Sequence, residues 1–211
     1  MRNILIIGDS YSTFEGYNPD GFDCYYSASS VNSDVNKVED TWWHKVMTET
    51  GSSLVSNNSW SGSTICHTGY NNFDCSKTSS FIHRVDSLIE SGFFKKNKID
   101  TVFVFGGTND SWANSPVGNL KYSNWEEGDL YCVLPAVCYL ACMLKVTLPN
   151  SDIIFIVNSG LKNEISEGIR NACDYYGCKS ICLRDIDKIS SHPTKKGMEQ
   201  IKNQILKSII L

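Results

Sequence analysis

Four positions, widely separated along the chain, carry residue types that acyl-transfer chemistry uses. Ser10, Gly62 and Asn109 each follow a segment with strand character, and His192 follows the last such segment. Acyl transfer requires a hydroxyl nucleophile, an imidazole that takes its proton, and donors aimed at the oxygen that becomes an oxyanion. Ser10 can supply the hydroxyl and His192 the base. The backbone N–H groups of Ser10 and Gly62, with the side-chain amide of Asn109, can supply the donors.

These positions can meet only if the segments before them are neighbouring parallel strands. Residues 4–7 form a β-branched apolar run without alternation, which is typical of a strand buried on both faces. Further strands are predicted over 54–58, 100–106, 151–158 and 179–184. Loops at the carboxyl ends of parallel strands converge into a crevice that holds ligands. We therefore expect the four positions to share one crevice.

Helical patterns separate the predicted strands. Helices are predicted over 40–51, 80–92, 130–148 and 163–176, and a last helix is expected to open at His192-Pro193-Thr194 and run to residue 209. Five strands, each followed by a helix or by a loop and a helix, predict an α/β fold: a three-layer α/β/α sandwich around a five-stranded parallel sheet. A chain of 211 residues fits one such domain, over residues 1–211, better than two.

Four short motifs, in the same order along the chain, resemble the signature blocks of the SGNH hydrolases, also called GDSL-type esterases and lipases. They are Gly8-Asp9-Ser10, the segment 57–62, Gly107-Thr108-Asn109-Asp110, and His192-Pro193 with Gly197. The resemblance implies a flavodoxin-like sandwich and carboxylic ester hydrolysis. It implies Ser10 as nucleophile, His192 as base, and an oxyanion hole formed by Ser10, Gly62 and Asn109. Members of the family use no metal and no organic cofactor.

The sequence departs from the family pattern at the acid of the catalytic triad. The family usually places an aspartate three residues before the histidine, and here that residue is Ile189. The nearest carboxylates are Asp187 and Asp185. Either Asp187 reaches His192 by a different loop path, or Ser10 and His192 act as a dyad with a backbone carbonyl orienting the imidazole. We favour the dyad, because substantial catalysis survives loss of the acid in serine proteases.

Aromatic residues in the loops of the expected active edge predict a surface that suits sugars. These residues are Tyr25, Trp60, Trp112 and Trp125. Aromatic rings are costly to expose without reason, and their flat faces suit sugar rings. No broad apolar stripe lies near the expected site, which argues against a long-chain lipid. We predict hydrolysis of short-chain esters, such as acetyl esters, of a carbohydrate or small metabolite. The alternative is a catalytically weak relative that binds glycans through these loops.

Charge and composition argue against other classes of partner. The net charge is -4, and basic residues cluster only at 95–98 and 195–196, which argues against nucleic acid or an anionic membrane as main partner. The apolar segment 130–148 contains Pro135 and is too interrupted to span a membrane by itself. The oligomeric state does not follow from the sequence.

The nine cysteines are scattered and show no zinc-type spacing, so no metal site is predicted. Free thiols of this kind are usual in a reducing compartment. The chain starts directly with its first strand, so we expect a cytoplasmic protein, although a chain that starts after a removed signal peptide would look the same.

Overall fold

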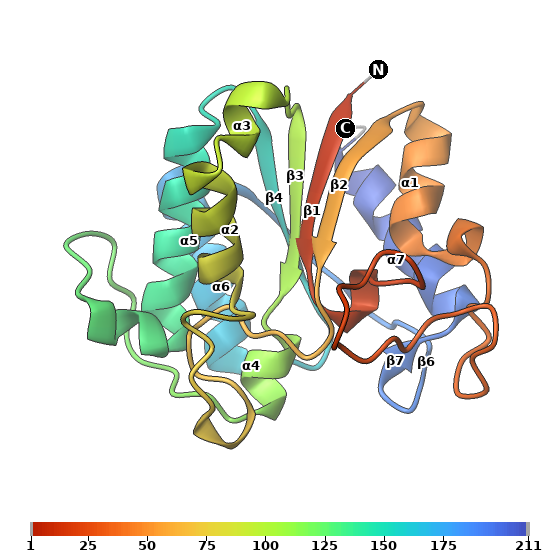
Figure 1. Cartoon of the computed structure of the whole chain (residues 1–211), viewed down its shortest axis with the longest axis horizontal. Helices are drawn as coiled ribbons and strands as arrows, with labels where there is room; N and C mark the ends of the chain where they lie inside the picture. Colours follow the sequence, from red (N-terminus) through yellow and green to blue (C-terminus); the bar gives the residue numbers. More distant parts are fainter. Residues whose placement is uncertain (1, 210–211) are drawn as a thin grey trace.

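The computed structural model describes residues 2–209, in which five parallel strands form a central sheet between two layers of helices (Figure 1). The strands are β1 (Asn3–Gly8), β2 (Ser53–Ser59), β3 (Thr101–Gly106), β4 (Asp152–Val157) and β5 (Lys179–Cys182). Their order in the sheet is β2-β1-β3-β4-β5. From β1 the sheet grows to one side with β2 and then to the other side with β3, β4 and β5. Such a reversal of strand order opens a ligand crevice at the carboxyl ends of β1 and β3. The predicted three-layer α/β/α sandwich is confirmed.

Each face of the sheet has its own apolar core. α1 (Trp42–Thr50) and α7 (Lys195–Ile209) cover one face, and α2 (Phe81–Glu90), α5 (Val133–Thr147) and α6 (Asn163–Tyr176) cover the other. Along β1, Ile4 and Ile6 pack in the first core, whereas Leu5 and Ile7 pack in the second. Because successive side chains of a strand point to opposite faces, burial on both faces explains the unbroken apolar run of β1.

Local signals explain where the predicted helices begin and end. The Thr41 side chain accepts a hydrogen bond from the backbone N–H of His44 and caps α1. Gly51 ends the same helix in a left-handed conformation, with a φ of 61°. Ser80 caps α2 in the same way as Thr41 caps α1. Two short helices, α3 (Phe93–Lys96) and α4 (Thr108–Trp112), complete the layers, and neither was among the helices predicted from the sequence.

The expected start of the last helix is wrong. Two-residue strands, β6 (Lys188–Ile189) and β7 (His192–Pro193), pair antiparallel and form a small hairpin before α7. Ser190 and Ser191 make its turn with positive φ angles of 48° and 67°, the backbone that a two-residue hairpin of type I′ requires. We call this β6–β7 unit the histidine hairpin. It places His192 on a turn-stabilised strand rather than on a helix.

The two ends of the described chain lie at the amino end of the sheet, away from the loops that follow the strands (Figure 1). Arg2 and Ile209 line the same small cavity there. No helix within residues 2–209 combines the length and the apolar character needed to cross a membrane.

Candidate active site

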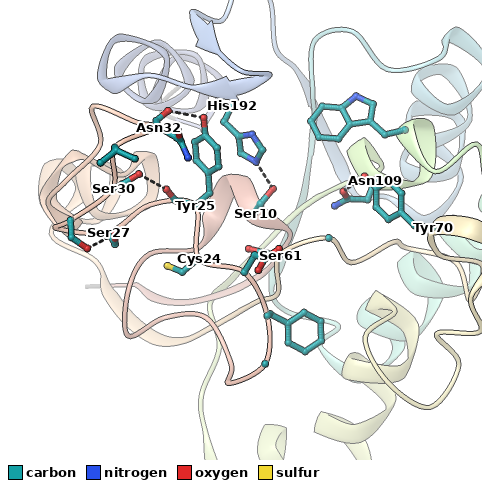
Figure 2. A pocket seen from close by; sticks show the side chains of 17 residues that line it. Ser10, Cys24, Tyr25, Ser27, Ser30, Asn32, Ser61, Tyr70, Asn109 and His192 are labelled. Carbon is teal, nitrogen blue, oxygen red and sulfur yellow. Dashed lines mark hydrogen bonds between the residues drawn. The ribbon is translucent and has the colours of Figure 1, made fainter.

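Ser10 and His192, from opposite ends of the sequence, meet at the carboxyl end of β1. The Oγ atom of Ser10 lies 3.0 Å from Nε2 of His192 (Figure 2). Ser10 begins a single 3₁₀ turn that the Asp9 carboxylate caps by accepting the backbone N–H of Tyr11 at 3.0 Å. Gly8 has no room for a side chain, since a Cβ atom there would lie 2.6 Å from Ser59 Oγ. The turn therefore brings the Ser10 hydroxyl to the imidazole.

The other ring nitrogen of His192 faces a backbone carbonyl. Nδ1 lies 3.2 Å from the carbonyl oxygen of Ser190, inside the turn of the histidine hairpin. A neutral imidazole that donates from Nδ1 to this oxygen keeps Nε2 free to accept the hydroxyl proton of Ser10. The carbonyl thus occupies the place that a carboxylate takes in a triad.

The two carboxylates considered for the triad lie elsewhere. Asp187 accepts a hydrogen bond from the hydroxyl of Thr194. Thr194 Oγ1 in turn accepts the backbone N–H of Gly197 at 3.1 Å, so this pair organises the start of α7. Asp185 is exposed in the turn after β5, with a φ of 53°.

Two buried tyrosines hold the main chain of the histidine hairpin. The hydroxyl of Tyr26 donates to the carbonyl of Pro193 at 3.0 Å. The hydroxyl of Tyr11 donates to the carbonyl of Ser191. Because residues other than glycine rarely adopt positive φ, a Ser-Ser turn needs support of this kind from its surroundings.

Tyr25 holds both the hairpin and the imidazole. Its hydroxyl donates to the carbonyls of Ile189, at 3.2 Å, and Asn32, at 2.9 Å. Its ring stacks on the ring of His192, with centroids 3.8 Å apart and planes 13° from parallel. Figure 2 shows the two rings side by side above Ser10. The stacking limits the rotation of the imidazole.

Asn109 is the side-chain donor of the site. It lies in α4, directly after the left-handed Gly107, whose φ is 89°. Its Nδ2 donates to the carbonyl of Ser63 at 3.0 Å, and its Oδ1 accepts the hydroxyl of Tyr70 at 2.8 Å. These two bonds fix the amide plane. Since an amide NH₂ group has two hydrogens, one remains available to a ligand.

Two backbone donors complete the set. Within residues 2–209, the N–H groups of Ser10 and Gly62 have no hydrogen-bond partner in the protein. Gly62 has a φ of 77°, in the left-handed region that favours glycine. Ser10, Gly62 and Asn109 line the same cavity. Preorganised donors of this kind can stabilise an oxyanion.

A buried arginine braces the loops beneath the site. The guanidinium of Arg84, on α2, donates to the carbonyl of Gly8 at 3.1 Å, to Ser63 Oγ at 3.1 Å and to Asn58 Oδ1 at 2.8 Å. It therefore ties together the ends of β1 and β2 and the loop that carries Gly62. Burial lowers the pKa of Arg84 to about 9, so the group stays charged at neutral pH.

Two buried carboxyl groups, Asp9 and Asp110, lie behind the site. Asp110 accepts the backbone N–H groups of Ile65 and Cys66 at 2.9 to 3.1 Å and so fixes the loop after β2. Burial raises the pKa of Asp110. Burial also raises the pKa of Asp9 to about 7, and the negative charge of Asp110 adds to that shift.

The electrostatic surroundings keep His192 neutral. Burial lowers its pKa below the usual value, the Ser190 carbonyl opposes that shift, and the charge of Lys188 adds to it. The ammonium group of Lys188 donates to Asn158 Oδ1 and to the carbonyl of Ser159, both at 3.1 Å. A neutral imidazole is the form that can take a proton from a hydroxyl.

The cavity that opens onto Ser10 has a volume of about 720 Å³. One wall comes from the loop 21–32, which contributes Ser27, Ser30 and Asn32 (Figure 2). Asp23 is the one residue of its lining, within residues 2–209, with an acidic side chain, and no lysine or arginine lines it there. The cavity therefore suits a ligand that carries hydroxyl groups and little net charge.

Of the four aromatic residues predicted to bind substrate, two line this cavity. Tyr25 stacks on the base, and Trp112 lies with its ring centroid 6.1 Å from that of His192. Trp60 and Trp125 have other surroundings.

Trp60 packs against the ring of Phe22, with centroids 5.1 Å apart, and beneath the guanidinium of Arg84. Trp125 packs edge-on against Tyr139 and donates its indole N–H to the carbonyl of Lys121. The loop that carries Trp125 packs on α5, away from the active edge, because the indole ring is partly buried against the core there.

Several residues of the site were not singled out in the sequence. They are Tyr11, Tyr70 and Arg84, each of which contacts a site residue or the backbone beside one. Arg84 had a usable signal, because it lies within the apolar helical segment over 80–92, where a charged residue needs a buried partner. The tyrosines had no such signal, since the groups that their hydroxyls bond, the Ser191 carbonyl and the Asn109 amide, lie far away in the sequence.

Comparison with known proteins gives one family match over almost the whole chain. The model of the GDSL-like lipase/acylhydrolase family matches residues 2–209. A crystal structure described as a GDSL-like lipase from Bacteroides ovatus ATCC 8483 is 47% identical, with a TM-score of 0.91, over 100% of this chain and 98% of that one. Another, described as a GDSL-like lipase from Bacteroides uniformis ATCC 8492, is 42% identical, with a TM-score of 0.90, over 100% and 96%.

A more distant structure is similar in fold alone. It is an acetyl xylan esterase from the rumen bacterium Butyrivibrio proteoclasticus, 18% identical, with a TM-score of 0.62, over 99% of this chain and 63% of that one. A search of curated protein sequences found no match.

Proposed function

The chain belongs to the GDSL-like lipase/acylhydrolase family and is an ester hydrolase, as its motifs indicated, and we propose that it works through a dyad of Ser10 and His192. The observation that carries the mechanism is the 3.0 Å contact between Ser10 Oγ and His192 Nε2. The 3.2 Å contact of Nδ1 with the Ser190 carbonyl supports the dyad form.

The reaction follows from this geometry. Nε2 of His192 takes the hydroxyl proton while Oγ of Ser10 attacks the carbonyl carbon of the ester. The oxygen that becomes negative receives hydrogen bonds from the N–H groups of Ser10 and Gly62 and from Nδ2 of Asn109. The protonated imidazole then gives its proton to the leaving alcohol, and an acyl group remains on Ser10. Water, activated by the same histidine, releases the acid and restores the hydroxyl.

The Ser190 carbonyl takes over one part of what a triad acid does. It holds the imidazole in one tautomer and one orientation, as a carboxylate would. It stabilises the imidazolium less, because it is a dipole and not a full charge. The rigid hairpin and the Tyr25 ring offset part of that loss by limiting the motion of the base.

The substrate we propose is a short-chain ester, such as an acetyl ester, of a carbohydrate or a small metabolite. Hydroxyl and amide side chains on the loop 21–32 can bond sugar hydroxyls, and Trp112 offers an aromatic face. The similarity in fold to an acetyl xylan esterase supports the same class.

The test uses p-nitrophenyl acetate and acetylated xylo-oligosaccharides with the wild type and three variants. Ser10→Ala should abolish turnover and the covalent adduct that a serine-directed phosphonate leaves on the intact protein. His192→Ala should keep the fold and lose turnover. Asn109→Ala should lose about 100- to 1000-fold in kcat, the usual effect of removing one oxyanion donor. Turnover by Ser10→Ala at the wild-type rate would refute the mechanism.

The second candidate is a glycan-binding protein with weak catalysis. It draws support from the absence of a carboxylate contact at His192 within residues 2–209 and from the open aromatic wall of the cavity. Calorimetric titration of xylo-oligosaccharides separates the two functions. Binding that Trp112→Ala removes, together with no burst of p-nitrophenol, would favour the binder.

A further inference from the structure

We propose that a groove beside Gly62 binds the acyl part of the ester, and that the enzyme therefore favours unbranched acyl chains longer than acetyl, such as butyryl and hexanoyl. This inference rests on the proposed function. It concerns the acyl side of the site, beyond Gly62 and Tyr70, and it follows from the direction of proton transfer and from the residues that line the groove.

The groove adjoins the cavity over Ser10. It has a volume of about 620 Å³, and it shares Phe22, Gly62 and Tyr70 with that cavity. From these shared residues it extends over Gly69 and Phe73. The two spaces therefore meet beside Gly62, which the proposed mechanism places at the reacting carbonyl.

The chemistry assigns the two spaces to the two halves of the ester. His192 must give its proton to the leaving oxygen, so the alcohol lies on the side of His192. The carbonyl oxygen points to Gly62 and Asn109. The remaining substituent is the acyl chain, which must leave away from His192. In Figure 2 His192 lies next to Ser10, whereas Tyr70 lies beside Asn109, farther from Ser10, and Tyr70 is a wall of the groove.

The lining of the groove, which also includes Asn71, Cys75, Thr78 and Ser79, offers apolar surface to a hydrocarbon chain. Aromatic rings of Phe22, Tyr70 and Phe73 form its walls, and no acidic or basic residue within residues 2–209 lines it. Phe73 is 62% exposed and Tyr70 is 41% exposed. Two large rings left open to water in one groove form the kind of apolar surface that marks a binding site.

The wall is shaped by its own hydrogen bonds. Thr68 and Asp74 form a β-bridge, and the N–H of Gly69 donates to the carbonyl of Phe73 at 2.8 Å. A Cβ atom at Gly69 would lie 2.6 Å from the Sγ atom of Cys75, so the backbone packs closely there. The segment thus presents Phe73 in a fixed place before any substrate arrives.

Tyr70 links the groove to the oxyanion donor. Its ring lines the groove, and its hydroxyl donates to Oδ1 of Asn109 at 2.8 Å. A chain that packs on the ring holds the tyrosine, and through it the amide of Asn109, in place. We therefore expect longer acyl chains to raise kcat as well as to lower KM.

The experiment measures kcat/KM for p-nitrophenyl acetate, butyrate and hexanoate, each divided by its rate of alkaline hydrolysis. Because the groove is open on one side, each added methylene should raise kcat/KM about twofold. This factor corresponds to roughly half of the free energy of burying a methylene completely. Hexanoyl has four more methylenes than acetyl, so the wild type should prefer hexanoate over acetate by about 16-fold. Phe73→Ser should lose most of this preference and hydrolyse acetate within twofold of the wild type, since an acetyl methyl does not reach Phe73. Phe73→Leu should restore the preference.

Val31→Ser is the matched control. Val31 is 93% exposed and lines the alcohol cavity but not the groove, so its change should leave the ratio of hexanoate to acetate unaltered. A ratio that falls as much in Val31→Ser as in Phe73→Ser would overturn the assignment. So would a wild type that hydrolyses acetate as well as it hydrolyses hexanoate.

The failure of this inference differs from a failure of the proposed function. Serine-dependent turnover of acetate without any preference for length rejects the groove and leaves the esterase intact. Equal rates for the wild type and Ser10→Ala with all three esters reject the esterase mechanism and the groove together.

Discussion

The ring of Tyr25 lies almost parallel to the imidazole of His192, with centroids 3.8 Å apart, and its hydroxyl bonds the backbone of the same hairpin at Ile189. One side chain thus contacts the base directly and also fixes the strand that precedes it. In a site where no carboxylate contacts the imidazole within residues 2–209, such contacts determine how well the base keeps its orientation.

Tyr25→Phe and Tyr25→Ala separate the two contacts. The Phe variant keeps the stacked ring and loses hydrogen bonds worth about 1 kcal/mol, so kcat should fall about fivefold. The Ala variant also loses the ring, so its kcat should fall about 100-fold, with a smaller change in KM. Initial rates with p-nitrophenyl acetate measure both. Tyr175→Ala, an exposed tyrosine of α6, is the control, and equal losses in the two Tyr25 variants would contradict the role of stacking.

Asp187→Ala tests whether a carboxylate takes part in the chemistry. Asp187 accepts from Thr194 at the start of α7, so its loss should lower the free energy of unfolding by about 1 kcal/mol. Turnover of p-nitrophenyl acetate should stay close to the wild-type rate. Urea denaturation and kcat measure the two effects. A fall of several hundredfold in kcat, with stability unchanged, would indicate a triad and not a dyad.

Lys188→Gln should move the acid limb of the pH profile to higher pH. The base must be neutral, so kcat/KM rises with pH through the pKa of His192, which burial and the charge of Lys188 hold below its usual value of 6.5. Without the ammonium charge the imidazolium is less disfavoured, and the pKa of His192 rises. Lys45→Gln, at a surface ion pair with Glu199, should leave the limb in place. A shift to lower pH in Lys188→Gln would have the wrong sign.

Arg84→Lys should destabilise the fold and slow the reaction. A lysine cannot reproduce the planar fork that reaches Gly8, Asn58 and Ser63 together, and it leaves buried acceptors without donors. We expect a loss of about 3 kcal/mol in urea denaturation and about tenfold in kcat. Arg170→Lys, on the exposed side of α6, should change stability by less than about 0.5 kcal/mol.

Asp9→Asn should flatten the pH dependence of stability. The pKa of Asp9 is raised from 3.8 to about 7, so the native state holds a proton that the unfolded chain releases between these values. The contribution of Asp9 to stability is therefore complete below pH 4 and is lost as the pH rises through 7, by on the order of 2–4 kcal/mol. The melting temperatures measured at pH 5 and at pH 8 should differ less for Asp9→Asn than for the wild type. An unchanged difference would contradict a protonated Asp9.

The sheet and most helices followed from local patterns, because the structure uses the signals that the sequence displays. β1 is buried on both faces and has an unbroken apolar run, and α1 lies between the capping Thr41 and the left-handed Gly51. The strand ends bring Ser10, Gly62 and Asn109 to one cavity, since the order of a parallel sheet sets which loops are neighbours.

The histidine hairpin could not be read from the sequence. Hairpin turns are usually signalled by Asn-Gly or Asp-Gly, and Ser190-Ser191 adopts the same backbone only because distant tyrosine hydroxyls bond it. Pro193 followed by an amphipathic segment looked like the start of a helix. Tertiary contacts from the first loop decided the local structure instead.

The ends of the described chain lie at the opposite end of the sheet from the cavity, with Arg2 and Ile209 close together. A solid support or a fused protein joined at either end would consequently leave the catalytic edge turned toward bulk solution. Attachment to a bead at either end should thus preserve access to the cavity, which makes this geometry suitable for immobilised biocatalysts.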